Sequence, residues 1–155
     1  MNVLRILTCA LGSLAISVFA VACGDDDEDT AATTTAAASA ETVNVTGEDF
    51  SYDLSATPTT ETKEITFENA GKQPHEVLFA RINEGYTLQD AIDAKGKKGT
   101  AEMIGRTFAE PGKEGKPIEI DQPLEPGHYA MLCAIPFKGT PHYELGMQEE
   151  FDITG

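Results

Sequence analysis

Alternation of apolar and polar residues predicts short β-strands over most of the chain from residue 42 onward. Residues two positions apart lie on the same face of a strand. The apolar sets that share a face are Val43 with Val45, Phe50 with Tyr52 and Leu54, Ile65 with Phe67, His75 with Val77 and Phe79, Ile118 with Ile120, Tyr129 with Met131 and Cys133, and Met147 with Phe151 and Ile153. This pattern predicts an all-β fold, an antiparallel β-sandwich with Greek-key connections.

The strand pattern stops between residues 84 and 116. TLQDAIDA has Leu88, Ala91 and Ile92 on one side of a short predicted helix, with Thr87 as its N-cap. We expect GTAEMIGRTF to add another turn or two of helix and EPGKEGK to form a loop. Residues 84–116 are therefore interpreted as a short helical insertion in the sandwich.

Residues 1–22 have the layout of an export signal. A start containing Arg5 precedes an apolar run of 17 residues, and small residues precede Cys23. A transmembrane anchor is the alternative, but the run is short for a membrane span and only Arg5 flanks it. AVAC followed by Gly24 resembles the end of a bacterial lipoprotein signal. The resemblance implies that Cys23 is lipidated and becomes the mature N-terminus, with plain secretion as the other interpretation.

Residues 23–41 combine a run of five acidic residues with an Ala/Thr tract and contain no large apolar side chain. Such a segment cannot bury enough apolar surface to fold. It is interpreted as a disordered tether for a domain at residues 42–155. We expect the protein to be exported and lipid-anchored to a bacterial cell membrane, facing the periplasm or the cell exterior.

The predicted domain at residues 42–155 is strongly acidic, with 20 Asp/Glu against 10 Lys/Arg. Nucleic acid is not expected as a partner because its recognition needs a basic surface. Acidity promotes solubility, and it also attracts a partner with a basic face; charge alone does not separate the two. Lys95, Lys97 and Lys98 form the one basic cluster, interpreted as a solvated loop with docking as the alternative.

The cysteines indicate a metal site. Cys9 lies in the predicted signal and Cys23 is the predicted lipid site, which leaves Cys133 alone in the domain. Exported proteins usually pair their cysteines, and a free thiol there is oxidised unless something occupies it. Cys133 ends a predicted strand, and His142 and Met147 follow it. One loop therefore offers a thiolate, an imidazole and a thioether.

A second imidazole belongs to His75, on the inward face at the start of the HEVLFARI strand. If the two strand ends meet, four ligands converge. Two histidines and a cysteine with a weak axial methionine form the arrangement of a blue copper site.

Three segments resemble the cupredoxins, or type 1 blue copper proteins, over residues 62–153. FENAGKQPHEVLF is similar to the plastocyanin segment with the first histidine, and LEPGHYAMLC is similar to the strand that leads to the copper cysteine. CAIPFKGTPHYELGM has eight residues between Cys and His and four between His and Met, a spacing similar to the type 1 site of copper nitrite reductases. The resemblance implies one copper ion with His75, Cys133, His142 and Met147 as ligands.

The chain departs from that pattern beside the ligands. Plastocyanins usually have Asn after the first histidine, where it ties the two ligand loops together, and this chain has Glu76. An aromatic residue often precedes the cysteine, and this chain has Leu132. Residues around the ligands orient them and tune the metal, so both changes bear on redox potential and rigidity.

Six residues are expected to contact the ligands or a docking partner. His142 should be the ligand whose edge lies near the surface, inside a small apolar patch. The six residues are Pro74, Glu76, Pro136, Phe137, Pro141 and Tyr143.

Each ligand alone has a plainer interpretation. Cys133 could be a small buried hydrophobe, His142 an exposed loop residue, Met147 core filler and His75 structural. Their joint placement at cupredoxin positions favours one copper site. His128 is expected to be exposed and uninvolved.

The function predicted from these residues is that of a one-electron carrier with a redox partner protein at the outer face of the membrane, and not an enzyme. The alternatives are a copper-binding module for storage or delivery, for which Met-rich clusters are missing, and a metal-free interaction domain. A nitrite reductase needs a histidine beside the cysteine, where Leu132 stands, and a dinuclear copper site needs a second cysteine in the loop.

Overall fold

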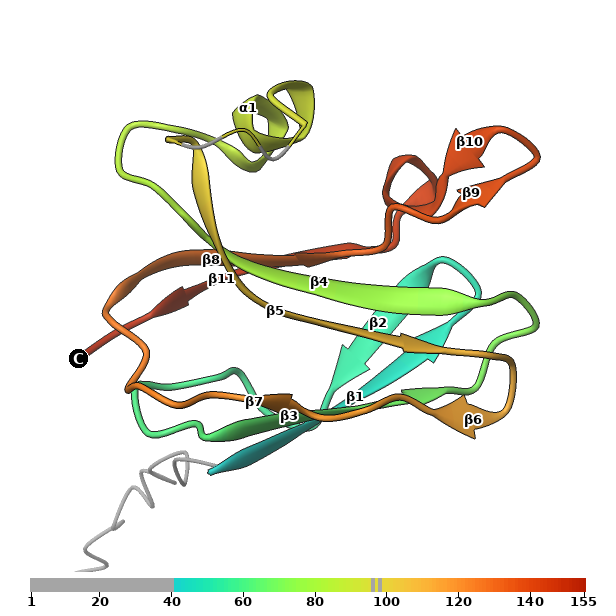
Figure 1. Ribbon diagram of the computed structural model, residues 1–155, viewed down its shortest axis with the longest axis horizontal. Helices are drawn as coiled ribbons and strands as arrows, with labels where there is room; N and C mark the ends of the chain where they lie inside the picture. The colour runs from blue at the N-terminus through green and yellow to red at the C-terminus, as the bar shows by residue number, and fades with distance from the viewer. Residues whose placement is uncertain (1–40, 96, 98) are drawn as a thin grey trace, which may run out of the picture. The chain divides into compact units, whose positions relative to one another are not determined.

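The computed structural model describes residues 41–95, 97 and 99–155. The predicted signal, Cys23, most of the tether and Lys98 lie outside the described residues. Two β-sheets pack face to face, with a helix outside one of them (Figure 1). None of the helices in the described part of the chain is long and apolar enough to cross a membrane.

The first sheet has the order β2-β1-β3-β6, and β7 also pairs with β3. Its strands are β1 (Thr42–Glu48), β2 (Ser51–Leu54), β3 (Glu64–Asn69), β6 (Lys113–Glu114) and β7 (Ile118–Glu119). β1 and β3 pair in parallel, with Val43 opposite Ile65 and Val45 opposite Phe67. The expectation of a purely antiparallel sandwich is wrong at this pair. The reason is that β2 returns to the start of β1, so that β3 begins at the same end and runs beside β1 in the same direction.

The second sheet has the order β11-β8-β4-β5 and is antiparallel throughout. Its strands are β4 (His75–Ile82), β5 (Ala101–Ala109), β8 (Gly127–Leu132) and β11 (Gln148–Ile153). A short hairpin of β9 (Pro136–Phe137) and β10 (Thr140–Pro141) and a 3₁₀ helix at His142–Leu145 lie in the loop between β8 and β11. This loop therefore stands at the end of the sheet where β8 finishes and β11 begins (Figure 1).

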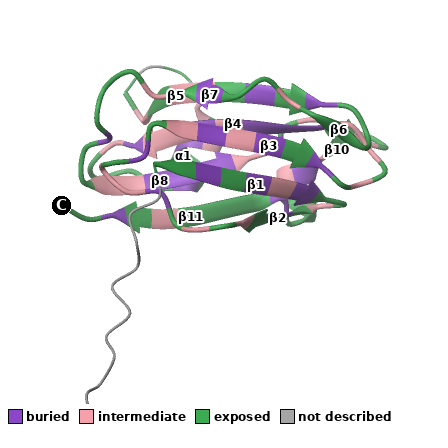
Figure 2. Ribbon diagram, turned by 90° about the horizontal axis from the view of Figure 1, so that it is seen from below, coloured by how far each residue is buried: buried purple, intermediate pink, exposed green. Residues whose placement is uncertain are grey.

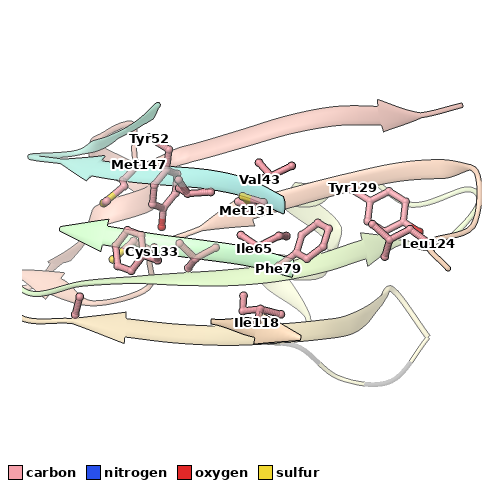
Figure 3. Close-up of a cluster of buried hydrophobic side chains, with 14 of the residues drawn as sticks. Val43, Tyr52, Ile65, Phe79, Ile118, Leu124, Tyr129, Met131, Cys133 and Met147 are labelled. Atoms are coloured by element: carbon pink, nitrogen blue, oxygen red, sulfur yellow. The ribbon is translucent and has the colours of Figure 1, made fainter. Parts of the chain in front are cut away.

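The core fills the space between the inner faces of the sheets (Figures 2 and 3). The period-two prediction is confirmed for most of the predicted sets, whose residues are buried; Phe50, Leu54, Ile120 and Phe151 are half-buried. The fully buried apolar set includes Val43, Val45, Ile65, Phe67, Val77, Phe79, Tyr129, Met131, Cys133 and Met147, each at most 1% exposed. Burial of this much apolar side chain is the main force that holds the two sheets together.

The helix α1 (Leu88–Asp93) covers part of the outer face of the second sheet. Thr87 caps it through a reciprocal capping box with Asp90, as the sequence predicts for a helix that starts here. Leu88 and Ala91 are buried against Ile82 and Ala130. A largely apolar cavity of about 420 Å³ remains between α1 and the sheet.

The strand β5 corrects the interpretation of residues 84–116 as helical insertion followed by loop. It pairs with β4 from His75 opposite Ala109 to Ile82 opposite Ala101. The sequence of β5 does not show the alternation of a strand because its register with β4 shifts between Phe79 and Ala80. A bulge of this kind breaks the period of two.

Exposed apolar residues also obscure the alternation in β5, because Met103 and Phe108 are 57% and 45% exposed on this edge strand. Gly105 sits where the sheets approach closely, since an added Cβ would lie 2.2 Å from Cγ2 of Ile118. The glycine therefore marks a close approach of two strands and not the end of a helix.

Candidate metal centre

The fold brings His75, Cys133 and His142 together at one end of the sandwich. His75 is the first residue of β4, and Cys133 directly follows β8, the strand paired with β4. His142 begins the 3₁₀ helix in the loop that follows. Two segments separated by more than fifty residues thus supply one cluster, because β4 and β8 pair so that the two strand ends meet.

The three side chains are arranged as donors around one point. Nδ1 of His75 lies 3.0 Å from Nδ1 of His142, and Sγ of Cys133 lies 3.3 Å from the same His142 nitrogen. All candidate donor atoms lie within 4.8 Å of one another. Two imidazole nitrogens bound to one ion at about 2.0 Å would stand roughly 3.3 Å apart, so the spacing fits a single metal ion.

The loop that carries three of the four predicted ligands is braced by its own main chain. The N–H of Cys133 donates to the carbonyl of Met147 at 3.1 Å, and the N–H of Met147 donates to the carbonyl of His142 at 3.0 Å. The N–H of Tyr143 donates to the carbonyl of Cys133 at 2.9 Å. Gly146, with φ of +112°, turns the chain from the 3₁₀ helix into Met147 and β11. Met147 is fully buried in the same core cluster as Cys133 (Figure 3).

Burial favours the uncharged forms of the three donors. His75 and Cys133 are 0% exposed and His142 is 1% exposed. Burial lowers the pKa of His75, with the neighbouring His142 as a second cause, and burial also lowers the pKa of His142. Burial raises the pKa of the Cys133 thiol, against the main-chain N–H groups of Glu76 and Ile135. Neutral imidazoles present free lone pairs to a cation, and a bound cation would displace the thiol proton.

Asp49 is a site residue that the sequence did not indicate. Its Oδ1 lies 3.6 Å from Nε2 of His75, the ring nitrogen opposite the one that faces His142. No well-aligned hydrogen bond reaches that Nε2 from the described residues. A carboxylate behind a ligand histidine fixes the ring orientation and raises its basicity. Asp49 follows β1 in a turn, and nothing in its sequence context distinguishes it from other exposed acids.

Gly71 keeps the path between Asp49 and His75 open. A Cβ at this position would lie 2.8 Å from both Oδ1 of Asp49 and Nε2 of His75. The N–H of Lys72 donates to the same Asp49 oxygen at 2.7 Å and holds the carboxylate in place. Hydrogen bonding to Lys72 is also the main cause that lowers the pKa of Asp49.

Aromatic rings pack against His142, whose edge was predicted to lie near the surface and which is 1% exposed. The Phe50 ring lies edge-on at 5.0 Å between centroids, and the Phe137 ring lies at 6.5 Å. Phe50 adopts a positive φ of 70°, which is uncommon for a bulky residue, and the sequence did not indicate its role.

The patch predicted around His142 is only partly open. Pro136 is exposed, while Phe137, Pro141 and Tyr143 are half-buried. Leu145, which is 41% exposed, adds to the apolar surface of this loop. The end of the sandwich that holds His75, Cys133 and His142 is called the metal end below. Its accessible part is the loop around His142 and not the histidine itself.

The two residues predicted beside His75 differ in burial. Pro74 is half-buried, whereas Glu76 is 3% exposed and its Oε1 accepts a hydrogen bond from the N–H of Ala134 at 3.2 Å. His128 of β8 lies between Glu150 and Asp152 of β11, in a different region. The residue is half-buried and not exposed as expected.

A solved structure shares this arrangement of strands. The crystal structure of Na-dithionite reduced auracyanin from the photosynthetic bacterium Roseiflexus castenholzii is 24% identical over 76% of this chain and 99% of its own, with a TM-score of 0.53. This chain has the cupredoxin fold. In the cupredoxin fold described here, His75, Cys133 and His142 form a donor set that can hold one copper ion.

Two further solved structures are similar to this chain. Auracyanin A, a "blue" copper protein from the green thermophilic photosynthetic bacterium Chloroflexus aurantiacus, is 19% identical over 73% of this chain and 98% of its own, with a TM-score of 0.49. Reduced rusticyanin is 19% identical over 75% of this chain and 81% of its own, with a TM-score of 0.45. No protein-family model and no curated protein matches the chain.

Proposed function

We propose that this protein is a type 1 copper protein that carries single electrons. The observation that supports this proposal is the convergence of two buried imidazole nitrogens and a buried thiol within 4.8 Å, beside a buried methionine. Soft sulfur donors suit Cu(I), and imidazole suits both copper oxidation states. A copper ion bound there would supply a reversible one-electron couple.

The chain's own part is to hold the donors still. The main-chain hydrogen bonds between Cys133, His142 and Met147 fix the loop, and the paired strands β4 and β8 fix His75 relative to Cys133. A site that does not rearrange when the charge on the ion changes lowers the reorganisation that electron transfer requires. Phe50 and Phe137 exclude water from the His142 side of the site.

Burial favours an electron carrier over a copper-delivery module. All three donors are at most 1% exposed, so a receiving protein could not reach them without opening the loop. The distinguishing measurement is the rate at which a chelator removes copper. Loss over hours supports the carrier, whereas loss within seconds supports delivery.

A transient redox partner would dock at the loop around His142. Phe137, Pro141, Tyr143 and Leu145 give this loop a small apolar surface, and redox encounters use small interfaces. The acidic charge of the domain favours a partner with a basic face. We further propose that Cys23 carries a lipid that holds the protein at the outer face of the cell membrane. The proposed electron carrier has no catalytic activity.

The decisive experiment is addition of Cu(II) to the purified protein, followed by absorption and electron paramagnetic resonance spectroscopy. An intense visible band with the narrow copper hyperfine splitting of a thiolate site is expected, and Cys133→Ser should abolish it. Met147→Leu should shift the spectrum and the reduction potential, whereas the control Met103→Leu, at an exposed position on β5, should change neither. A colourless complex without a reversible couple would refute the proposal.

A further inference from the structure

Glu76 has a side-chain carboxylate that is buried from solvent. The residue is 3% exposed, immediately after the ligand His75 in β4. A buried carboxylate is costly unless it is paired and hydrogen-bonded, so its retention beside a metal site needs a specific reason.

Glu76 contacts the cysteine loop through two of its groups and the facing sheet through a third. Its side-chain Oε1 accepts a hydrogen bond from the N–H of Ala134 at 3.2 Å, and its main-chain N–H points at the Cys133 sulfur. Its main-chain carbonyl accepts a hydrogen bond from the Tyr52 hydroxyl, which belongs to the opposite sheet. One residue thus joins the strand of His75, the loop of Cys133 and the facing sheet.

Arg106 compensates the charge of Glu76. The Nη2 atom of Arg106 lies 2.6 Å from Oε2 of Glu76, and no well-aligned hydrogen bond from the described residues reaches that oxygen. Phe108 is the direct partner of Glu76 across β4 and β5, so Arg106, two residues away, is its diagonal neighbour. The arginine side chain is 64% exposed and the glutamate side chain 4% exposed. The negative end of the pair is therefore inside the protein, and the positive end is in solvent.

We propose that the Glu76–Arg106 pair braces the metal loop and sets the charge balance at the site. The statement rests on the proposed copper function. The Glu76 carboxylate positions Ala134, and hence Cys133, while its negative charge stabilises the oxidised, more positive ion. Arg106 offsets that charge from the surface. An uncharged amide in place of Glu76 would keep an acceptor for the Ala134 N–H but would change the charge near the metal.

The charge part of the proposal is tested by the copper reduction potential of four proteins. Glu76→Gln should raise the potential, Arg106→Gln should lower it, and the double variant should return close to the starting value. The matched control is Arg81→Gln, which removes an equal charge from the far end of β4, where Arg81 pairs with Glu125. Arg81 is six residues from His75, roughly 20 Å along the strand, so its loss should leave the potential almost unchanged.

The bracing part is tested in the metal-free protein. In Glu76→Ala, the Ala134 amide proton should exchange roughly tenfold faster with solvent, the factor expected for loss of a hydrogen bond to a charged group. The same amide should stay protected in Glu76→Gln. Thermal unfolding should show that Arg106→Gln loses stability and that the double variant regains part of it.

Several results would overturn the proposal. Potentials that shift in the same direction in Glu76→Gln and Arg106→Gln would contradict the charge part, even with an intact copper spectrum. Unchanged exchange of the Ala134 amide in Glu76→Ala would contradict the bracing part without reference to copper. Failure to bind copper at all would refute the proposed function together with the charge part, while the metal-free measurements would still decide whether Glu76 braces the loop.

Discussion

The two ends of the second sheet place histidines in opposite environments, which shift the histidine pKa in opposite directions. At the end where β8 finishes, His75 and His142 face one another in a buried cluster, and burial lowers the pKa of both. At the end where β8 begins, His128 lies between Glu150 and Asp152, 2.9 Å from each, and hydrogen bonds to these carboxylates raise its pKa. The far end pairs its imidazole with two carboxylates, whereas the other end brings its imidazoles close to each other and to a thiol, which forms a donor set that can hold a metal ion.

Adding a metal should give the largest effect that separates the two ends. A ligand that binds only the folded state stabilises it by about 4 kcal/mol at a thousandfold excess over its dissociation constant. Copper should therefore raise the unfolding temperature of the protein strongly, and calorimetry of the metal-free and loaded forms measures this. The gain should vanish in Cys133→Ser and persist in His128→Gln, because His128 belongs to the other end.

Removing the carboxylate behind His75 should give the next largest effect. Contacts of this kind typically change metal affinity by about 10–100-fold, so Asp49→Ala should weaken copper binding by that factor in a competition titration. The matched control is Asp53→Ala, an exposed acid on the neighbouring strand β2, for which no change is expected. Equal losses in both variants would show that general negative charge, and not the Asp49–His75 contact, supports the site.

Acid should weaken the metal end of the metal-free protein. A histidine whose pKa is lowered on folding binds more protons in the unfolded chain, so its contribution is complete above the ordinary value of 6.5. That contribution is lost as pH falls from 6.5 through the lowered folded values. Denaturant unfolding at several pH values should show this loss, and it should shrink in His142→Gln. A stability independent of pH below 6.5 would contradict the assignment of neutral imidazoles.

The far end should show a small effect of the opposite sign. His128 has a raised pKa, so its contribution is present below 6.5 and is lost as pH rises through the folded value. Its side chain is 40% exposed, and exposed ion pairs contribute less than about 1 kcal/mol. His128→Gln should therefore remove a shallow decline in stability on the alkaline side and leave the acid decline intact.

The sequence predicts the core strands and the donor set better than the residues around them. Alternation identifies Val77, Phe79, Tyr129 and Met131 because both sheets bury one face. The predicted strands place His75 and Cys133 at strand ends, and these ends form one cluster with His142 because β4 pairs with β8.

Alternation of apolar and polar residues does not predict β5, the edge strand of the second sheet. β5 carries exposed Met103 and Phe108 and a register shift, so it lacks the alternation of a half-buried strand. Arg106 on this strand gave no signal as the partner of Glu76. An edge strand is specified by pairing with its neighbour, and single-strand patterns do not record pairing.

Asp49 and Phe50 were also missed, although they lie close to the ligands. Both belong to the turn between β1 and β2, and their contacts depend on how that turn meets the other sheet. Such contacts join residues more than twenty positions apart. Only the three-dimensional arrangement shows them.

The order of the donors along the chain has a consequence for how the protein matures. Cys133, His142 and Met147 lie in the connection between β8 and β11, after every strand of the two sheets except β11. Synthesis proceeds from the N-terminus, so His75 is made more than fifty residues before Cys133 and His142. The donor set that can hold one metal ion is therefore incomplete until His142 has been synthesised.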